Sequence, residues 1–318
     1  MGHRPVASVI HLLRSAVDRI TGRKKVKTTP FHEKNGNVPF NASGVVQVGS
    51  RRFVFVDNKD PTALFEMTFD ADVLAVERIH RRRLVGVDKR VLRDPEGLTR
   101  VDLNGETFLI VSSSLCIADA DRSGRRQIDD GLVRVRYSPE GDLPAEAMDG
   151  FRAWLVAHEP TLAASGLREP DAGGLNVEGL AWDPSTSALL FGLRGPASPG
   201  RVAVVQVPVD AGGARWTTAS LGSPTVTYAR IPRSTAVQGI RDISYDARTG
   251  DFVLLLGRST SRGAEPFQLC TWNRGSDGVQ LLDITFHRTA KPEGVTTFSI
   301  GDQRKMLVVD DAGGYAVL

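Results

Sequence analysis

The sequence predicts an all-β protein folded as a single β-propeller, and three observations support this prediction. Short alternating strands separated by tight turns begin near residue 40 and continue to the C-terminus. One two-strand unit recurs at intervals of 53, 82, 63 and 52 residues. Four-stranded propeller blades repeat about every 40–50 residues, and longer intervals contain insertions. Gly and Pro account for 32 and 17 of the 318 residues, which supplies the turns that such a fold needs.

The repeated unit has a constant order of features. A small residue or a Glu-Gly pair opens an alternating strand, a tight turn follows, and a second strand of aromatic and β-branched residues ends in polar residues. Strict alternation of apolar and polar residues is typical of half-buried strands. The first strands of the units open at Ser43, Glu96, Glu178, Arg241 and Glu293. We therefore predict five recognisable blades and leave a sixth open.

The longest interval between units contains an insertion. Apolar residues recur at helical spacing between Pro144 and Gly166, which predicts a helical insertion over about residues 144–166. Either this helix replaces or precedes an outer strand, or a degenerate sixth blade lies nearby. The last unit ends one strand early, and residues 25–31 form a strand pattern that could complete it. Such closure would remove exposed sheet edges, so we assign the propeller to residues 25–318.

Residues 1–24 form a basic extension ahead of the propeller. Apolar residues at three- and four-residue steps between Val6 and Ile20 predict an amphipathic helix that ends at Gly22. Seven basic residues and the single acid Asp18 occupy residues 1–27. This helix either docks on the propeller or makes a weak contact with a membrane surface or another protein through residues 5–27.

Composition excludes several classes of protein. The formal net charge is only +3, so we expect no nucleic-acid partner. Cys116 and Cys270 lie far apart without neighbouring ligands at metal-binding spacing, which favours two apolar core residues over a disulfide or zinc site. No apolar run reaches the roughly 18 residues of a membrane span, and no cleavable signal sequence is recognisable. We therefore expect a cytoplasmic protein.

The predicted functional face lies at one mouth of the central channel. The first strand of a blade begins at one face of the ring and the second strand returns to it, so the polar ends of both strands gather there. Three like-charged carboxylates at a narrow channel repel one another unless they are compensated. The candidate catalytic residues and metal ligands are Glu96, Glu178 and Glu293. The candidate ligand-binding residues are Arg194, Arg241, Asp242, Arg258, Asp57, Asn58 and Asp310.

Compensation has three possible sources. Ca²⁺ takes about six to eight oxygen ligands, and the predicted ring offers carboxylate and amide oxygens. Arg194, Arg241 and Arg258 could instead neutralise the carboxylates through charge-assisted hydrogen bonds. The third alternative is a metal-free site for a small polar or anionic ligand. Residues 119–130 also match the pattern of an EF-hand-type loop. They lie between predicted strands, however, and Arg125 and Arg126 follow the glycine at the sixth position of the loop. A solvated loop between strands is the alternative.

The chain lacks other catalytic signatures. Neither a Gly-x-Ser-x-Gly elbow nor a phosphate-binding glycine loop occurs, and the six histidines form no metal-spaced pair. Serine-nucleophile, nucleotide and histidine-metal mechanisms are therefore not supported by the sequence.

Three segments resemble the DUF3616 family of bacterial β-propeller proteins of unknown function. These segments are 94–99, 175–181 and 193–196, and the resemblance covers about residues 36–318. More distantly, Glu-Gly at the start of a first strand is similar to lactonase, gluconolactonase and phytase-like esterase propellers. In the lactonase group a channel carboxylate binds the metal, which implies Glu178 as the first Ca²⁺ ligand and Glu96 and Glu293 as the next. Arg241 departs from this pattern in the fourth unit.

These features lead to two hypotheses. In the first, the channel mouth binds a small polar ligand and hydrolyses an ester, lactone or phosphoester with Ca²⁺, which would polarise the substrate and activate water. The three glutamates would serve as ligands or general base, while Arg194 and Arg258 would hold a negative substrate group. In the alternative, the chain is a non-catalytic propeller, a scaffold or sensor that binds a protein partner or a membrane surface.

Overall fold

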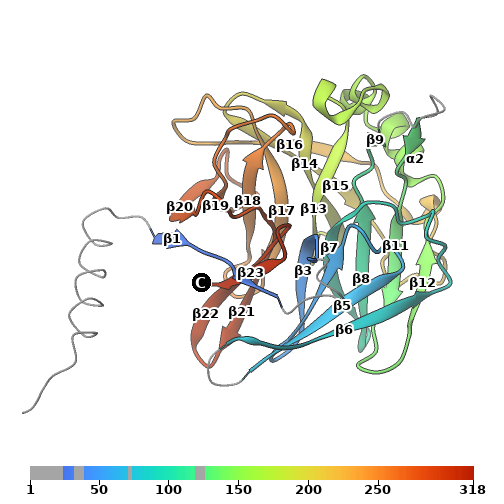
Figure 1. Ribbon diagram of the computed structural model, residues 1–318. Helices are drawn as coiled ribbons and strands as arrows, with labels where there is room; N and C mark the ends of the chain where they lie inside the picture. Colours follow the sequence, from blue (N-terminus) through green and yellow to red (C-terminus); the bar gives the residue numbers. More distant parts are fainter. Residues whose placement is uncertain (1–23, 32–38, 71–73, 119–125) are drawn as a thin grey trace, which may run out of the picture.

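The computed structural model describes residues 24–31, 39–70, 74–118 and 126–318, and within them the strands form five blades around a common axis (Figure 1). Each inner strand packs against the inner strand of the next blade, and the last packs against the first, so the ring is closed. The inner strands are β3 (Ala42–Gly49), β7 (Pro95–Leu103), β13 (Asn176–Asp183), β17 (Gln238–Asp246) and β21 (Pro292–Ile300). The predicted propeller is confirmed, and no sixth blade occurs among the described residues.

Each blade contains four antiparallel strands, and the outermost strands of blades one and two also pair in parallel, so these two blades form one eight-stranded sheet. The outer strands of blades one and two are β4 (Arg52–Asp57), β5 (Ala63–Phe69), β6 (Val76–Val85), then β8 (Glu106–Ser113), β11 (Leu132–Arg136) and β12 (Leu143–Ala147). Those of blades three and four are β14 (Ala188–Ser198), β15 (Arg201–Pro208), β16 (Thr225–Arg230), then β18 (Asp251–Arg258), β19 (Gln268–Trp272) and β20 (Gln280–Phe286). Blade five contains β22 (Gln303–Asp310), β23 (Gly314–Val317) and β2 (Thr29–Pro30).

The N-terminal segment closes the ring, as predicted from residues 25–31. Strand β2 pairs antiparallel with β23 and so becomes the fourth strand of blade five. The preceding strand β1 (Lys24–Val26) pairs in parallel with β20 and adds a fifth strand to blade four. In Figure 1 the blue N-terminal strands run beside the red C-terminal ones. The predicted amphipathic helix lies in residues 1–23, outside the described residues.

An aromatic cluster anchors this closure. The Phe31 ring stacks on the Phe55 ring of blade one and on the Tyr315 ring of blade five, with both centroid distances at 5.4 Å. Phe40 packs edge-on against Phe31 and Phe55. Burying side chains of this size contributes about 1.5–3 kcal/mol each, which fixes the segment before blade one against the last blade.

The insertion follows the outer strand of blade two. Helix α2 (Phe151–His158) begins later than the predicted residue 144, because residues 143–147 form β12. Leu143 and Ala145 are buried while Pro144 and Glu146 are exposed, the alternation of a strand. The 3-10 turns η1 (Pro160–Leu162), η2 (Ser165–Leu167) and η3 (Pro170–Ala172) lead from α2 to blade three.

No helix in the described part of the chain combines the length and apolar character needed to cross a membrane.

Candidate functional site

A β-bulge interrupts the inner strand of blades two to five at the residue that opens each repeat. The pairing register with the second strand shifts at Glu96, Glu178, Arg241 and Glu293. In blade one the shift falls next to Ser43, at Gly44. A bulge leaves one residue unpaired and re-aims its side chain. Contacts between blades one and two, three and four, and four and five bring these side chains together at the centre of the ring.

Arg241 links two of the three predicted glutamates. Its Nε donates a hydrogen bond to Glu293 Oε2 at 2.6 Å, and its Nη2 bonds to Glu293 Oε1. The same Nη2 lies 3.2 Å from Glu178 Oε2, while Arg194 Nη1 donates to Glu178 Oε1 at 2.8 Å. Arg241 and Glu178 are only 6% and 3% exposed. Two guanidinium groups therefore neutralise Glu178 and Glu293 inside the ring, the arrangement expected for compensation by arginine.

The third glutamate has a different environment. Ser43 Oγ donates to Glu96 Oε2 at 2.6 Å, and no basic side chain among the described residues forms an ion pair with Glu96. Burial raises the pKa of Glu96 well above its ordinary value of 4.5, and the charges of Glu178 and Asp94 add to this. Burial therefore favours the protonated form of Glu96.

Burial also changes the pKa values of Glu293 and Arg241, which form an ion pair. Burial raises the pKa of Glu293 to about 7, although the charge of Arg241 acts in the opposite direction. Burial acts to lower the pKa of Arg241, but Glu178 and Glu293 outweigh it and raise that pKa overall. Arg241 thus remains a cation throughout the physiological range.

The glycine after each ring glutamate allows neighbouring inner strands to approach closely. A Cβ atom on Gly179 would lie 2.7 Å from the Ile243 backbone nitrogen, and one on Gly97 would lie 2.6 Å from Leu180 Cβ. Real Cβ atoms essentially never come this near to other heavy atoms. Gly294 likewise faces the Gly44 backbone nitrogen at 3.0 Å. The Glu-Gly repeat therefore combines a side chain for the ring with a contact between blades.

Asp242 takes the place of this glycine in blade four. Its Oδ2 accepts a hydrogen bond from the Val295 N–H of β21 at 2.6 Å, and its Oδ1 accepts from the Ile243 N–H at 2.8 Å. Burial raises the pKa of Asp242 well above its ordinary value. The side chain predicted to bind ligand thus connects the inner strands of blades four and five.

The remaining predicted residues occupy the ends of second strands. Asp57 accepts a hydrogen bond from the Lys59 N–H at 2.9 Å, and Asp310 accepts from Lys291 and Ala312 N–H groups. Both carboxylates are fully buried and hold turns. Asn58 and Arg258 each keep one buried polar atom, Oδ1 and Nε, without a partner in the described chain.

The ring does not fit Ca²⁺. This ion needs about six to eight oxygen ligands, whereas Glu178 and Glu293 direct their oxygens at guanidinium groups. Among the described residues, the three glutamates do not form a group whose ligand atoms lie within 4.8 Å of one another.

Two residues of the site were not singled out by the sequence. Ser43 opens the first repeat where the other units have a charged residue, and this position in the repeat marked it as equivalent. Asn176 lies two residues before Glu178 on the same strand, and its Nδ2 is 3.4 Å from Glu178 Oε1. Register shifts on both sides of Val177 interrupt the two-residue period of this strand, so the spacing alone did not indicate this contact.

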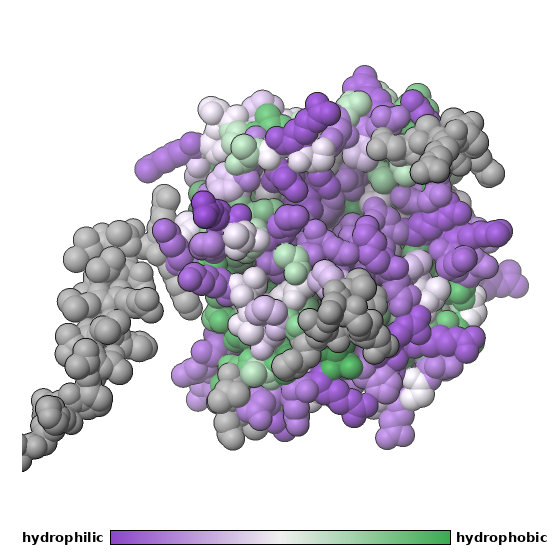
Figure 2. All heavy atoms as spheres, viewed as in Figure 1, coloured by the Kyte–Doolittle hydropathy of each residue, from purple (hydrophilic) through white to green (hydrophobic). Residues whose placement is uncertain are grey.

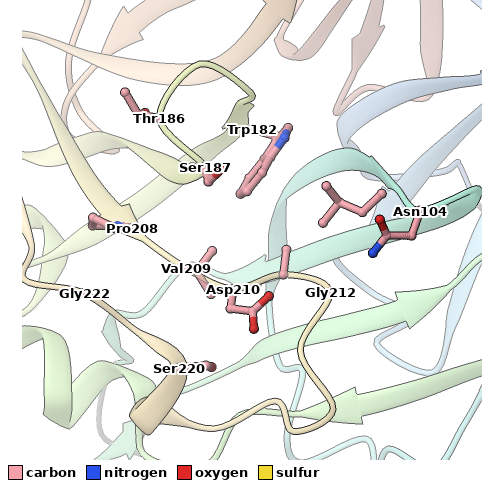
Figure 3. Close-up of a pocket in the computed structure, with 12 residues that line it drawn as sticks. Asn104, Trp182, Thr186, Ser187, Pro208, Val209, Asp210, Gly212, Ser220 and Gly222 are labelled. Carbon is pink, nitrogen blue, oxygen red and sulfur yellow. The ribbon is translucent and has the colours of Figure 1, made fainter.

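A separate hollow lies between blades two and three, at the other ends of their inner strands. Its volume is about 550 Å³, and Asn104, Trp182, Ser187 and Asp210 are among the residues that line it (Figure 3). The lining contains no lysine, arginine or histidine. None of the residues predicted for the site lines it, so this hollow is distinct from the charged ring.

Residues 170–316 match a family described as "Protein of unknown function (DUF3616)". The resemblance to this family is confirmed. The DUF3616 match covers blades three to five and includes Glu178, Arg194, Arg241 and Glu293, whereas Ser43 and Glu96 lie outside it. No curated protein sequence matches the chain.

Solved structures show only distant similarity to this chain. The major allergen Mala s 1 of Malassezia sympodialis is 10% identical, with 88% of this chain and 78% of that chain covered and a TM-score of 0.39. A luciferin-regenerating enzyme is 11% identical, with coverage of 89% and 88% and a TM-score of 0.40. An exo-β-1,3-galactanase of Phanerochaete chrysosporium is 11% identical, with coverage of 91% and 62% and a TM-score of 0.47. Similarity at this level supports no inference about activity.

Proposed function

We propose that the ring at the channel mouth binds a small anionic ligand through Arg194 and Arg241. The observation that supports this is a pair of unsatisfied donors: Arg194 Nε and Arg241 Nη1 are buried and have no hydrogen-bond partner among the described residues. A buried donor left without a hydrogen bond costs about 1–3 kcal/mol, and more when it belongs to a charged group. Both guanidinium groups contact Glu178, so the two free donors belong to one cluster.

The other polar atoms of the cluster narrow the class of ligand. Two arginines face two paired glutamates, so an anion would be held by directed hydrogen bonds to guanidinium rather than by a large net charge. Asn176 Oδ1 is a buried acceptor that has no partner in the described chain. A ligand that carries both anionic oxygens and a hydroxyl group satisfies these donors and this acceptor together. A phosphate monoester or a small hydroxy acid has this combination.

Binding of inorganic phosphate tests the proposal. Calorimetric titration of the full chain should give saturable binding, and Arg194→Gln should weaken it at least about tenfold, because a charge-assisted hydrogen bond contributes about 1.5–3 kcal/mol. Arg136 forms a surface ion pair with Glu106, so Arg136→Gln is a matched control that should bind phosphate normally. Absence of binding to the wild-type chain, or equal binding by Arg194→Gln, would overturn the proposal.

Hydrolysis of an ester, lactone or phosphoester at this site is a further proposal. It is supported by Glu96, whose Oε2 accepts a hydrogen bond from Ser43 and whose pKa burial raises well above its ordinary value. A positioned carboxyl close enough to Arg241 to influence its charge can transfer a proton to a bound anionic ester. A screen of ester, lactone and phosphoester substrates should show turnover that Glu96→Gln reduces by about 100-fold or more. Turnover unchanged in Glu96→Gln would rule out this role.

The scaffold alternative remains a proposal that depends on the basic N-terminal extension. The face shown in Figure 2 is largely hydrophilic, with hydrophobic residues in small separate patches. The most exposed large apolar residues, Leu167 and Ile128, lie on different elements. Deletion of residues 1–22 should abolish binding to anionic lipid vesicles if the extension binds membranes, and it should leave phosphate binding unchanged.

A further inference from the structure

A second group of potential ligands lies beside the ring, formed by Asp94, Cys116 and Asp129. One carboxylate oxygen of each aspartate and the cysteine sulfur all lie within 4.8 Å of one another. Asp94 directly precedes β7, while Cys116 and Asp129 flank the hairpin of β9 (Ile117–Ala118) and β10 (Gln127–Ile128). The Asp129 N–H donates to the Cys116 carbonyl at 3.0 Å. Regular secondary structure therefore holds the cysteine opposite the second aspartate.

Among the described residues, Asp129 has weaker hydrogen-bond donors than the other buried aspartates. Its Oδ1 accepts from Gln127 Nε2 at 3.2 Å, and its Oδ2 accepts from the Cys116 thiol at 3.5 Å. The other buried aspartates of the described chain each accept at least one backbone N–H. They are Asp57, Asp183, Asp242, Asp246 and Asp310. A thiol is a weak donor, so within the described part of the chain Asp129 Oδ2 is open to a stronger partner.

Within the described residues, no basic side chain forms an ion pair with this group. Arg152 is a buried cation whose charge reaches Cys116 and Asp129, but its guanidinium donates to the Leu115 and Gly166 carbonyls at 2.7 and 2.6 Å. Buried charges are stable when they are paired or coordinate a metal.

We propose that Asp94, Cys116 and Asp129 form a binding site for a divalent cation of the Zn²⁺ class. A cysteine sulfur with two carboxylates suits borderline-soft ions such as Zn²⁺ and Co²⁺, whereas Ca²⁺ and Mg²⁺ select oxygen ligands alone. On binding, the sulfur–metal bond forms as the thiol proton leaves for solvent, with no change of oxidation state. Three protein ligands leave a fourth position open. The three proposed ligands are not among the residues of the proposed anion site in the ring.

Co²⁺ provides a direct test, because a cysteine-bound Co²⁺ ion has a sulfur-to-metal charge-transfer band in the near ultraviolet. Titration of the chelator-treated full chain should produce this band at one equivalent, and one equivalent of Zn²⁺ should remove it. Cys116→Ser should abolish the band. The other cysteine is also buried and has no carboxylate neighbour of this kind among the described residues, so Cys270→Ser should retain it.

Two further variants guard against misfolding. Asp94→Asn and Asp129→Asn keep the thiol and remove one ligand charge each, and both should weaken Co²⁺ binding at least about tenfold. Circular dichroism and the melting temperature report whether each variant folds. Absence of the band in the wild-type chain, or its persistence in Cys116→Ser, would overturn the proposal. Phosphate binding and Arg194→Gln are separate measurements, so this site and the anion site can fail independently.

Discussion

The inner strand of blade four differs from those of blades two, three and five at two consecutive positions. The other three strands place Glu-Gly at the bulge, whereas blade four places Arg241-Asp242 there. Arg241 supplies a positive charge that compensates the glutamates. Asp242 accepts a hydrogen bond from β21, whereas the glycine at the same position of the other blades allows close contact between inner strands. A ring with identical blades would bury a further carboxylate and need a cation from solvent. The broken repeat thus supplies a positive charge to the ring from a side chain.

The largest expected effect follows from removing the central guanidinium. Arg241→Met leaves Glu178 paired with Arg194 alone and removes the ion-pair partner of Glu293. Breaking a buried ion pair in this way costs about 3–5 kcal/mol. Denaturant unfolding monitored by circular dichroism measures the free energy of unfolding. Arg241→Lys keeps the charge and should lose less. Equal losses for the two variants would show that packing, rather than charge, explains the role of Arg241.

A smaller loss is expected where glycine separates the inner strands. Gly179→Ala places a Cβ atom against the backbone of Asp242 and Ile243, and overpacking of this kind costs about 1–3 kcal/mol. A Cβ atom on Gly212 would lie no nearer than 3.4 Å to its neighbours, so Gly212→Ala is the control and should remain close to wild type. Thermal unfolding compares the two, and similar melting temperatures would contradict the close-approach explanation.

Asp242→Asn should destabilise the chain by about 1–2 kcal/mol. The amide keeps the size of the side chain but replaces one of the two acceptors with a donor, which leaves the N–H of Val295 or Ile243 unsatisfied. Hydrogen exchange at these two amides should accelerate more than exchange elsewhere in β17. Unchanged exchange at both amides would mean that Asp242 does not connect blades four and five.

The smallest effect concerns pH. The folded pKa of Glu96 lies well above its ordinary value of 4.5, so the unfolded chain loses this proton first as the pH rises. The folded state is therefore penalised increasingly from about pH 4.5 upward, and Glu96→Gln removes the penalty. We expect Glu96→Gln to gain stability relative to wild type between about pH 5 and pH 7, while the exposed Glu106→Gln shows no such trend. A constant difference across this range would contradict the protonated state of Glu96.

The repeat pattern predicted the architecture and the face of the site. Strand alternation identified the blades, and the Glu-Gly pairs located Glu96, Glu178 and Glu293 at the ring because every blade repeats the same geometry. The pattern could not place the boundary between β12 and α2, because Ala147 fits the periodicity of a strand and that of a helix equally. The ends of second strands were less informative: Asp57 and Asp310 hold turns, a local role that polar residues share with ligand binding.

Pairing across blades lay beyond sequence reasoning. Arg241 and Glu293 are 52 residues apart, and only the closure of the ring shows that this arginine, rather than Arg258, neutralises the glutamates. The sequence likewise predicted Cys116 as an apolar core residue, and only the structure shows that it lies beside Asp94 and Asp129. Charged groups from separate blades are brought together by tertiary packing, which leaves no signal in the local spacing.

We infer that Arg241, rather than a metal ion, compensates the carboxylates of the ring. Calorimetric titration of Ca²⁺ into the chelator-treated wild-type chain and into Glu178→Gln tests this inference. We predict no Ca²⁺ binding that depends on Glu178. Stoichiometric binding by the wild type that Glu178→Gln abolishes would show that the ring holds a cation despite Arg241, and would overturn the inference.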